Sequence, residues 1–252
     1  MSLFTLYWLA VTTGEAAFTG LPSPTPEAPG VAVGVKQPTG GGTVLAIMDS
    51  DFVDNALPAP FASGTLRTLV VDRSGGLLDF YYQLINRVDG NGDIFDEFFR
   101  MKTTGGFPTL TVLSVGQTDS LAGLIAGVGS GFDPANYVTG FSLKPAATAD
   151  RDVATIGSVG FDFSTTKPAF IGDPGNIGDL ERSMFLVVRT DSSGFGLVPM
   201  VISGAATSFA TSFASLPEPS SVLAGLAIIG AALIHRCYRL QKLPRSVESK
   251  FR

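Results

Sequence analysis

An acidic stretch, Asp89–Glu97, holds the residues best suited to bind a cation. Side-chain oxygens at alternating positions could surround a hard cation such as calcium. The candidate ligands are Asp89, Asn91 and Asp93, with Asp96 or Glu97 completing the shell. The stretch departs from an EF-hand loop, because Ile94 replaces the required glycine and Arg100 replaces the bidentate glutamate. Asn-Gly and Asp-Gly pairs also form hairpin turns, so a solvated turn is the alternative.

The absence of two residue types from most of the chain excludes several chemistries. The single histidine, His235, and the single cysteine, Cys237, both lie near the C-terminus. The preceding residues therefore cannot supply a Ser-His-Asp triad, a cysteine nucleophile or an ordinary zinc or copper site. A glycosidase needs only two carboxylates, but nothing in the sequence selects a pair. We therefore predict that the protein is not an enzyme, with a glycan-active enzyme as the alternative.

Two further patterns resemble binding sites. Residues Gly127–Gly131 follow an apolar run like a nucleotide-binding glycine loop, but the third glycine and the βαβ context are missing. We predict a flexible loop there. Five aromatic residues could line a sugar-binding face, although aromatics at strand spacing more often fill a core. They are Tyr81, Tyr82, Phe98, Phe99 and Tyr137.

Composition favours an all-β body. The 252 residues include 30 glycines and 16 prolines, while only 15% are charged, which is typical of a chain with many short strands and turns. Residues 217–252 carry six basic and two acidic side chains, a net +4. The remainder carries eleven basic and twenty acidic side chains, a net −9, which argues against a nucleic-acid partner.

Strand-forming runs bounded by Gly, Pro, Asp or Asn predict roughly nine or ten strands. The tight turn Arg73–Gly76 predicts a hairpin, with a bulky face at Leu78 and Phe80 and a more polar face at Asp79 and Gln83. Residues Asp173–Asn176 predict a turn. The expected strands are Val31–Val35, Thr43–Met48, Gly64–Asp72, Gly76–Asn86, Phe95–Lys102, Thr109–Val115, Val138–Leu143, Val153–Phe163, Met184–Thr190 and Leu197–Ser203.

Helical periodicity is weak throughout the body. Only Leu121–Val128 and Asp179–Phe185 could hold a short helical turn. The fold class that we expect is therefore an all-β, antiparallel β-sandwich, jelly-roll-like, followed by a single C-terminal transmembrane helix.

That helix is predicted from the segment after Pro217-Glu218-Pro219. Proline lacks a backbone donor and restricts its predecessor, so the triplet marks a boundary. Ser220 and Ser221 can cap a helix, and Val222–Ile234 is uninterruptedly apolar. A full span needs residues 220–238, and the basic residues after it would stay on the cytoplasmic side. A buried or interfacial helix is the alternative.

These residues resemble the PEP-CTERM sorting tail of Gram-negative and related bacteria. The matching features are the motif Pro217, Glu218, Pro219 and Ser220, the apolar run, and the basic stop at Arg236 and Arg239. The resemblance implies Sec export, recognition and probable cleavage by an exosortase-type membrane protease, and delivery to the cell surface or exopolysaccharide matrix. Similar tails are also classed with ice-binding proteins, but the regular threonine repeat of an ice-binding face is missing.

The resulting domain plan has five parts. Residues 1–20 are a signal peptide shortened by a misplaced start codon or else a first strand, and 21–42 are a Pro/Gly-rich linker. Residues 43–215 form the body, 216–239 the motif, helix and basic cluster, and 240–252 a basic cytoplasmic tail. We expect an exported, membrane-anchored intermediate that is delivered to the surface as a non-catalytic structural or binding protein. It needs no cofactor other than the calcium considered above.

Overall fold

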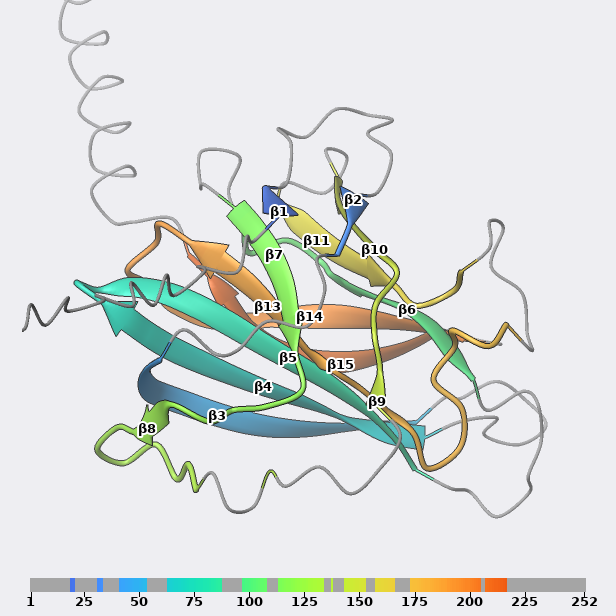
Figure 1. Ribbon diagram of the computed structural model, residues 1–252, viewed down its shortest axis with the longest axis horizontal. Coiled ribbons are helices and arrows are strands. Elements are labelled where there is room, and N and C mark those ends of the chain that lie inside the picture. The colour runs from blue at the N-terminus through green and yellow to red at the C-terminus, as the bar shows by residue number, and fades with distance from the viewer. Residues whose placement is uncertain are drawn as a thin grey trace, which may run out of the picture.

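The computed structural model contains fifteen strands in two sheets and no α-helix among the residues that it describes. These residues are 19–20, 31–33, 41–53, 63–87, 97–107, 113–133, 137, 143–152, 157–165, 173–204 and 207–216. Both sheets contribute side chains to one shared core, which makes the body a two-layer β-structure (Figure 1). The all-β prediction is thus confirmed.

The first sheet has the order β1-β7-β13-β5-β4-β3-β8. In addition, β12 pairs with β5, and β9 pairs with β12. Its long members are consecutive hairpin partners β3, β4 and β5, each of eleven or twelve residues. The strands are β1 (Thr19–Gly20), β3 (Gly42–Val53), β4 (Ser63–Ser74), β5 (Leu77–Arg87), β7 (Leu113–Thr118), β8 (Leu124–Ala126), β9 (Leu143–Lys144), β12 (Arg182–Ser183) and β13 (Phe185–Thr190).

The second sheet has the order β15-β14-β6-β11-β10-β2 and is antiparallel throughout. Its strands are β2 (Val31–Ala32), β6 (Phe98–Thr103), β10 (Thr148–Asp152), β11 (Ser158–Asp162), β14 (Phe195–Gly204) and β15 (Thr207–Ser215). Strand β15 packs against β3, β4 and β5, so the edge of this sheet lies against the long strands of the first.

The predicted β4–β5 hairpin is confirmed. Gly75 and Gly76 form its two-residue loop, with φ of 71° and 80°, a conformation that only glycine adopts without strain. Alternate residues of β5 then point into the shared core, including Phe80 and Tyr82. The Tyr82 hydroxyl donates a hydrogen bond of 2.7 Å to the carbonyl of Phe213 on β15. This bond ties the two sheets together across the core.

The other face of β5 is buried as well, which its sequence did not show. Asp79, Tyr81 and Gln83 are all buried, because the chain from Leu121 to Phe132 covers the outside of the first sheet. A second apolar cluster forms there, and its members are Val44, Leu69, Val71, Tyr81, Leu121, Leu124, Phe132, Phe185 and Val187. Asp79 and Gln83 share the face opposite Phe80 and Tyr82 as predicted, but a strand's period reveals its two faces and not what covers each of them.

Two segments considered for helical turns form short strands instead. Residues 121–128 contain β8, which pairs in parallel with β3, and residues 179–185 contain β12, which pairs in parallel with β9. The first sheet is therefore mixed rather than purely antiparallel. Both segments fit a sheet edge, where neighbouring backbone supplies hydrogen bonds that a one-turn helix would have to find alone.

Strand β15 was absent from the prediction. Its sequence repeats Thr-Ser-Phe-Ala, and its small residues Ser208, Ala210, Ser212 and Ala214 face inward while Phe209 is 66% exposed. This reverses the usual pattern of large apolar residues inside. The small inner face lets β15 approach β3 closely enough for the Thr211 N–H to donate to Ser50 Oγ at 3.0 Å.

The predicted transmembrane segment, Val222–Ile234, lies outside the described residues. Within the described residues, no helix has the length and apolar character needed to cross a bilayer. The described chain ends at Leu216, one residue after β15.

Candidate functional site

Of the predicted ligands and motif residues, only Glu97 lies in the part of the chain that the structure describes, and its Oε2 accepts a hydrogen bond of 2.8 Å from Asn176 Nδ2. The others fall outside it. These are Asp89, Asn91, Asp93 and Asp96 of the calcium prediction, and Pro217, Glu218, Pro219, Ser220, Arg236 and Arg239 of the sorting prediction. Among the described residues, no group of three or more histidine, cysteine or acidic side chains is arranged to hold a metal ion. Calcium binding therefore stays a prediction.

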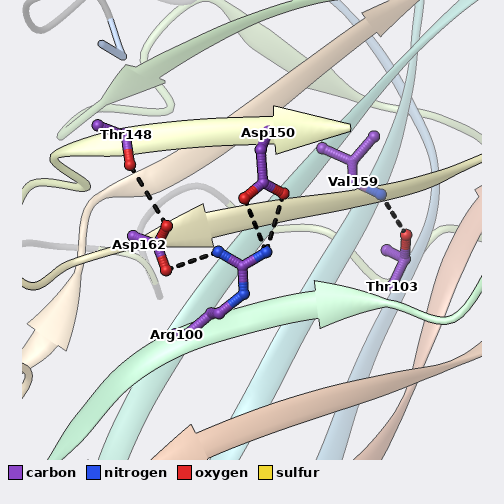
Figure 2. Close-up of polar contacts among 6 residues, drawn as sticks. All are labelled: Arg100, Thr103, Thr148, Asp150, Val159 and Asp162. Atoms are coloured by element: carbon purple, nitrogen blue, oxygen red, sulfur yellow. Dashed lines mark hydrogen bonds and ion pairs between the residues drawn. The ribbon is translucent and has the colours of Figure 1, made fainter. Parts of the chain in front are cut away.

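The described constellation that brings two carboxylates together centres on Arg100. It lies on the outer face of the second sheet, where Arg100 of β6, Asp162 of β11 and Asp150 of β10 occupy neighbouring strands (Figure 2). Arg100 Nη1 donates to Asp162 Oδ1 at 2.6 Å, and Nη2 donates to both oxygens of Asp150 at 2.8 Å. Thr148 Oγ1 adds a long hydrogen bond of 3.4 Å to Asp162 Oδ2.

A glycine makes this geometry available. Arg100 is directly opposite Asp162, whereas Asp150 is opposite Gly160 on the intervening strand. A Cβ at Gly160 would lie 2.5 Å from Arg100 Nη2 and 2.7 Å from Asp150 Oδ1. The missing side chain thus lets the guanidinium cross β11 and reach β10, which is a common role of glycine inside a strand.

The charges of this cluster compensate one another. Burial lowers the pKa of Arg100, but the hydrogen bond and charge of Asp162, together with those of Asp150, outweigh burial and leave the pKa above its ordinary value. The guanidinium therefore stays protonated at all physiological pH values. Two hydrogen bonds from Nη2 to the oxygens of Asp150 and one from Nη1 to Asp162 orient both carboxylates relative to their strands.

This arrangement suits a structural role better than glycoside hydrolysis. A glycosidase needs one carboxyl group to donate a proton and the other to attack or to activate water, with the sugar between them. Here Arg100 bonds to both Asp150 and Asp162 and lies between them. The cluster can join three strands through side chains, but it offers neither a free acid nor a free nucleophile.

A second charged cluster lies on the outer face of the first sheet. It has one carboxylate between two arginines, whereas the first has one arginine between two carboxylates. Asp79, only 2% exposed, contacts Arg73 Nη1 at 3.4 Å and Arg189 Nε at 3.2 Å. Burial raises the pKa of the Asp79 carboxyl, and the positive charges of Arg189 and Arg73 only partly oppose that rise. Perturbed carboxylates mark many active sites, but a substrate could not reach one so deeply buried.

Asp173 is the third organised carboxylate of the described residues. Its oxygens accept hydrogen bonds from Ser164 Oγ, from the Thr165 hydroxyl and backbone, and from the Gly175 N–H, at 2.8 to 3.2 Å. The Asn176 N–H donates to the Asp173 carbonyl at 3.0 Å, which confirms the predicted turn. Asp173 thus fixes this turn against the end of β11.

The glycine-rich segment and the five aromatic residues that resemble binding sites do not form such sites in the described residues. Residues 127–131 form a turn after β8, and no helix follows within the described residues, so the loop prediction is confirmed. Tyr81, Tyr82 and Phe98 are buried in the two cores. Phe99 is half-buried, and Tyr137 stacks on Phe132 beneath the guanidinium of Arg67. These positions do not form a continuous aromatic face.

The C-terminal end of the described fold is held firmly. The Leu216 N–H donates to the Gly194 carbonyl at 3.1 Å, and Ser192 Oγ donates to the Leu216 carbonyl at 3.3 Å. The next residue is Pro217, the first of the predicted sorting motif. The folded body and the motif therefore meet without an intervening linker.

Sequence reasoning missed the Arg100 and Asp79 clusters. One signal was available, since Gly160 between Val159 and Phe161 interrupts a strong strand and indicates a close approach. Nothing in the sequence pairs Arg100 with residues 50 and 62 positions away. Comparison with family models, curated proteins and solved structures finds no match to this chain.

Proposed function

We propose that the chain is an exported envelope or extracellular-matrix protein whose C-terminal Pro-Glu-Pro, apolar and basic segments direct its sorting. The Sec machinery would export it, and the apolar segment would hold an intermediate in the membrane. An exosortase-type protease would then recognise Pro217, Glu218, Pro219 and Ser220, with Arg236 and Arg239 as the basic stop. The body would act as a non-catalytic, jelly-roll-like structural or binding domain, with exopolysaccharide as one candidate partner.

The observation that carries this proposal is the junction between the fold and the motif. Strand β15 ends at Ser215, Leu216 is hydrogen-bonded to the body and is its last described residue, and Pro217 follows in the sequence. Cleavage after Leu216 would release every strand of the described body. A protease acting at the motif would therefore separate the sorting signal from the body without cutting a strand.

The non-catalytic assignment draws support from the described carboxylates. Those that contact Arg or Lys side chains are Asp49, Asp51, Asp79, Asp150, Asp162 and Glu181. An ion-paired carboxylate makes a poor proton donor, because protonation would break the pair. These pairs instead link strands, as a rigid display domain requires.

The test replaces one glutamate in the motif and a matched one outside it. Glu218→Gln removes the charge of the Pro-Glu-Pro triplet, and Glu248→Gln makes the same change in the far tail. Each full-length variant is expressed in the native host and followed by fractionation and intact mass. We expect the wild type and Glu248→Gln to yield a product that ends near Pro217, and Glu218→Gln to stay full length in the membrane.

Two results would overturn the proposal. Unchanged processing of Glu218→Gln would show that sorting does not depend on the charged residue of the Pro-Glu-Pro motif. A wild-type product that still ends at Arg252 and stays in the membrane would describe an ordinary tail-anchored protein instead.

A further inference from the structure

Six of the nine large apolar side chains that are exposed in the described residues gather at one end of the body. We call this the tail end, and its exposed residues are Leu45, Leu77, Ile125, Val128, Leu197 and Leu216. Single exposed apolar residues are ordinary, whereas a gathering at one end calls for an explanation. Val53 and Leu180 lie at the opposite end, and Phe209 lies along β15.

The sheet register shows that these residues share one end. Ile125 pairs with Thr43, which pairs with Asp72, which in turn pairs with Leu78. The Leu78 N–H donates to Ser192, whose hydroxyl donates to Leu216. The β4–β5 turn and β8 accordingly lie on the same side of Figure 1.

Leu197 completes this end on the second sheet. It lies two residues after Phe195, which pairs with Ser215 at the end of β15, and its side chain is 62% exposed. At the opposite end, Val53 pairs with Ser63 and Ser63 with Arg87. The exposed Arg87–Asp51 ion pair lies there, beside the exposed Val53.

The sequence determines which end faces the membrane. Only five residues, 217–221, separate Leu216 from the apolar segment that begins at Val222. Five extended residues span at most about 18 Å. Strand β4 has twelve residues and is about 40 Å long, so the body cannot stand on its opposite end on a bilayer that holds Val222.

We infer that the tail end is a lipid-contacting surface, which rests on the bilayer while the protein is anchored. This inference depends on the proposed function, because the anchor brings the surface to the lipid. The exposed leucine, isoleucine and valine side chains would enter the interfacial layer, where burial of apolar area is favourable. The contact would hold the body upright beside its sorting motif until cleavage at the motif releases the body.

The test places one reporter at matched sites. The full-length chain carries Cys237→Ser, so that a single new cysteine can take the fluorophore NBD. Leu197→Cys and Ile125→Cys report on the tail end, and Leu180→Cys is the control at the opposite end. Leu197, Ile125 and Leu180 are 62%, 62% and 59% exposed, so solvent contact alone cannot separate them.

Each labelled protein is reconstituted into phosphatidylcholine vesicles with a shallow doxyl-lipid quencher, and flotation is measured in parallel. Zwitterionic lipid avoids repulsion of the acidic body. We expect quenching of about half the fluorescence at residues 197 and 125, and below about a tenth at residue 180. Proteins that float but show equal quenching at all three sites would overturn the inference alone. Proteins that fail to float would overturn the anchor and the inference together.

Discussion

The outer faces of the two sheets each carry one charged cluster, with opposite compositions. On the first sheet, one carboxylate, Asp79, lies between two arginines and is almost completely buried. On the second sheet, one arginine, Arg100, lies between Asp150 and Asp162 and keeps about a fifth of its side chain exposed. The burial differs because residues 121–132 cover the first sheet.

This difference shows that the covering of a sheet decides how much an ion pair matters. A buried charge has lost its hydration and depends on its partners, whereas a partly exposed one can return to water. The pKa of Asp79 is raised by burial despite two adjacent positive charges. The pKa of Arg100 is raised by its partners despite burial. Loss of a partner should therefore cost more on the first sheet.

Removal of Asp79 should have the largest effect. Asp79→Ala removes the buried carboxylate that Arg73 and Arg189 share and leaves a void in its place, and we expect a loss of about 3 kcal/mol in the free energy of unfolding. Urea unfolding of the purified full-length chain, followed by far-UV circular dichroism, measures it. A loss below that of Arg100→Ala would break the comparison.

Removal of Arg100 should have a smaller effect. Arg100→Ala leaves Asp150 and Asp162 as like charges on adjacent strands, but both keep contact with water. We expect a loss of about 2 kcal/mol in the same unfolding experiment, partly recovered by salt that screens the repulsion. Arg100→Lys is the matched control, because it keeps the charge but not the bidentate geometry. An Arg100→Lys variant as stable as the wild type would show that charge alone matters, whereas one no more stable than Arg100→Ala would show that the geometry of the guanidinium decides.

The pH dependence of Asp79 sharpens the comparison. Its folded pKa is raised above the ordinary 3.8, so the folded state holds a proton that the unfolded state has lost between these two pKa values. The contribution of Asp79 to stability is therefore fully present below about pH 3.8 and falls as pH rises through the folded pKa. The unfolding free energy of wild type minus that of Asp79→Asn should therefore fall as pH rises across this window. A difference that is flat or rises with pH would contradict the raised pKa.

The exposed ion pair between Arg87 and Asp51 should contribute least to the free energy of unfolding. Arg87 and Asp51 are 2.7 Å apart, but their side chains are 53% and 61% exposed. We expect Arg87→Gln to change the unfolding free energy by less than about 0.5 kcal/mol. The same urea titration measures this change. A loss as large as that of Arg100→Ala would show that the contribution of an ion pair to stability does not depend on its burial.

Local chemistry made some of these features predictable. Gly75 and Gly76 supply the positive φ angles of a two-residue hairpin loop, so the β4–β5 hairpin could be predicted from its residues. Asp173–Asn176 likewise forms its turn through a bond between residues three apart. Strand β15 escaped prediction because its inner face is made of serines and alanines, while Phe209 is exposed and Phe213 only partly buried.

The charged clusters could not be predicted in the same way. Arg100 meets Asp150 and Asp162 only because β6, β11 and β10 are neighbours and Gly160 leaves a path between them. Alternation in β5 places Asp79 on the more polar face of the strand but gives no information about what covers that face. Both clusters depend on contacts between residues far apart in the chain.

The sequence by itself determined the all-β class, the glycine hairpin loop and the order in which the body precedes its Pro-Glu-Pro segment. These follow from backbone preferences and from neighbours within a few residues. Only the tertiary structure decided that Asp79 is buried, that Arg100 joins three strands, and that exposed apolar side chains gather where Leu216 leaves the body. Burial, charge pairing and shared surfaces depend on which distant strands become neighbours.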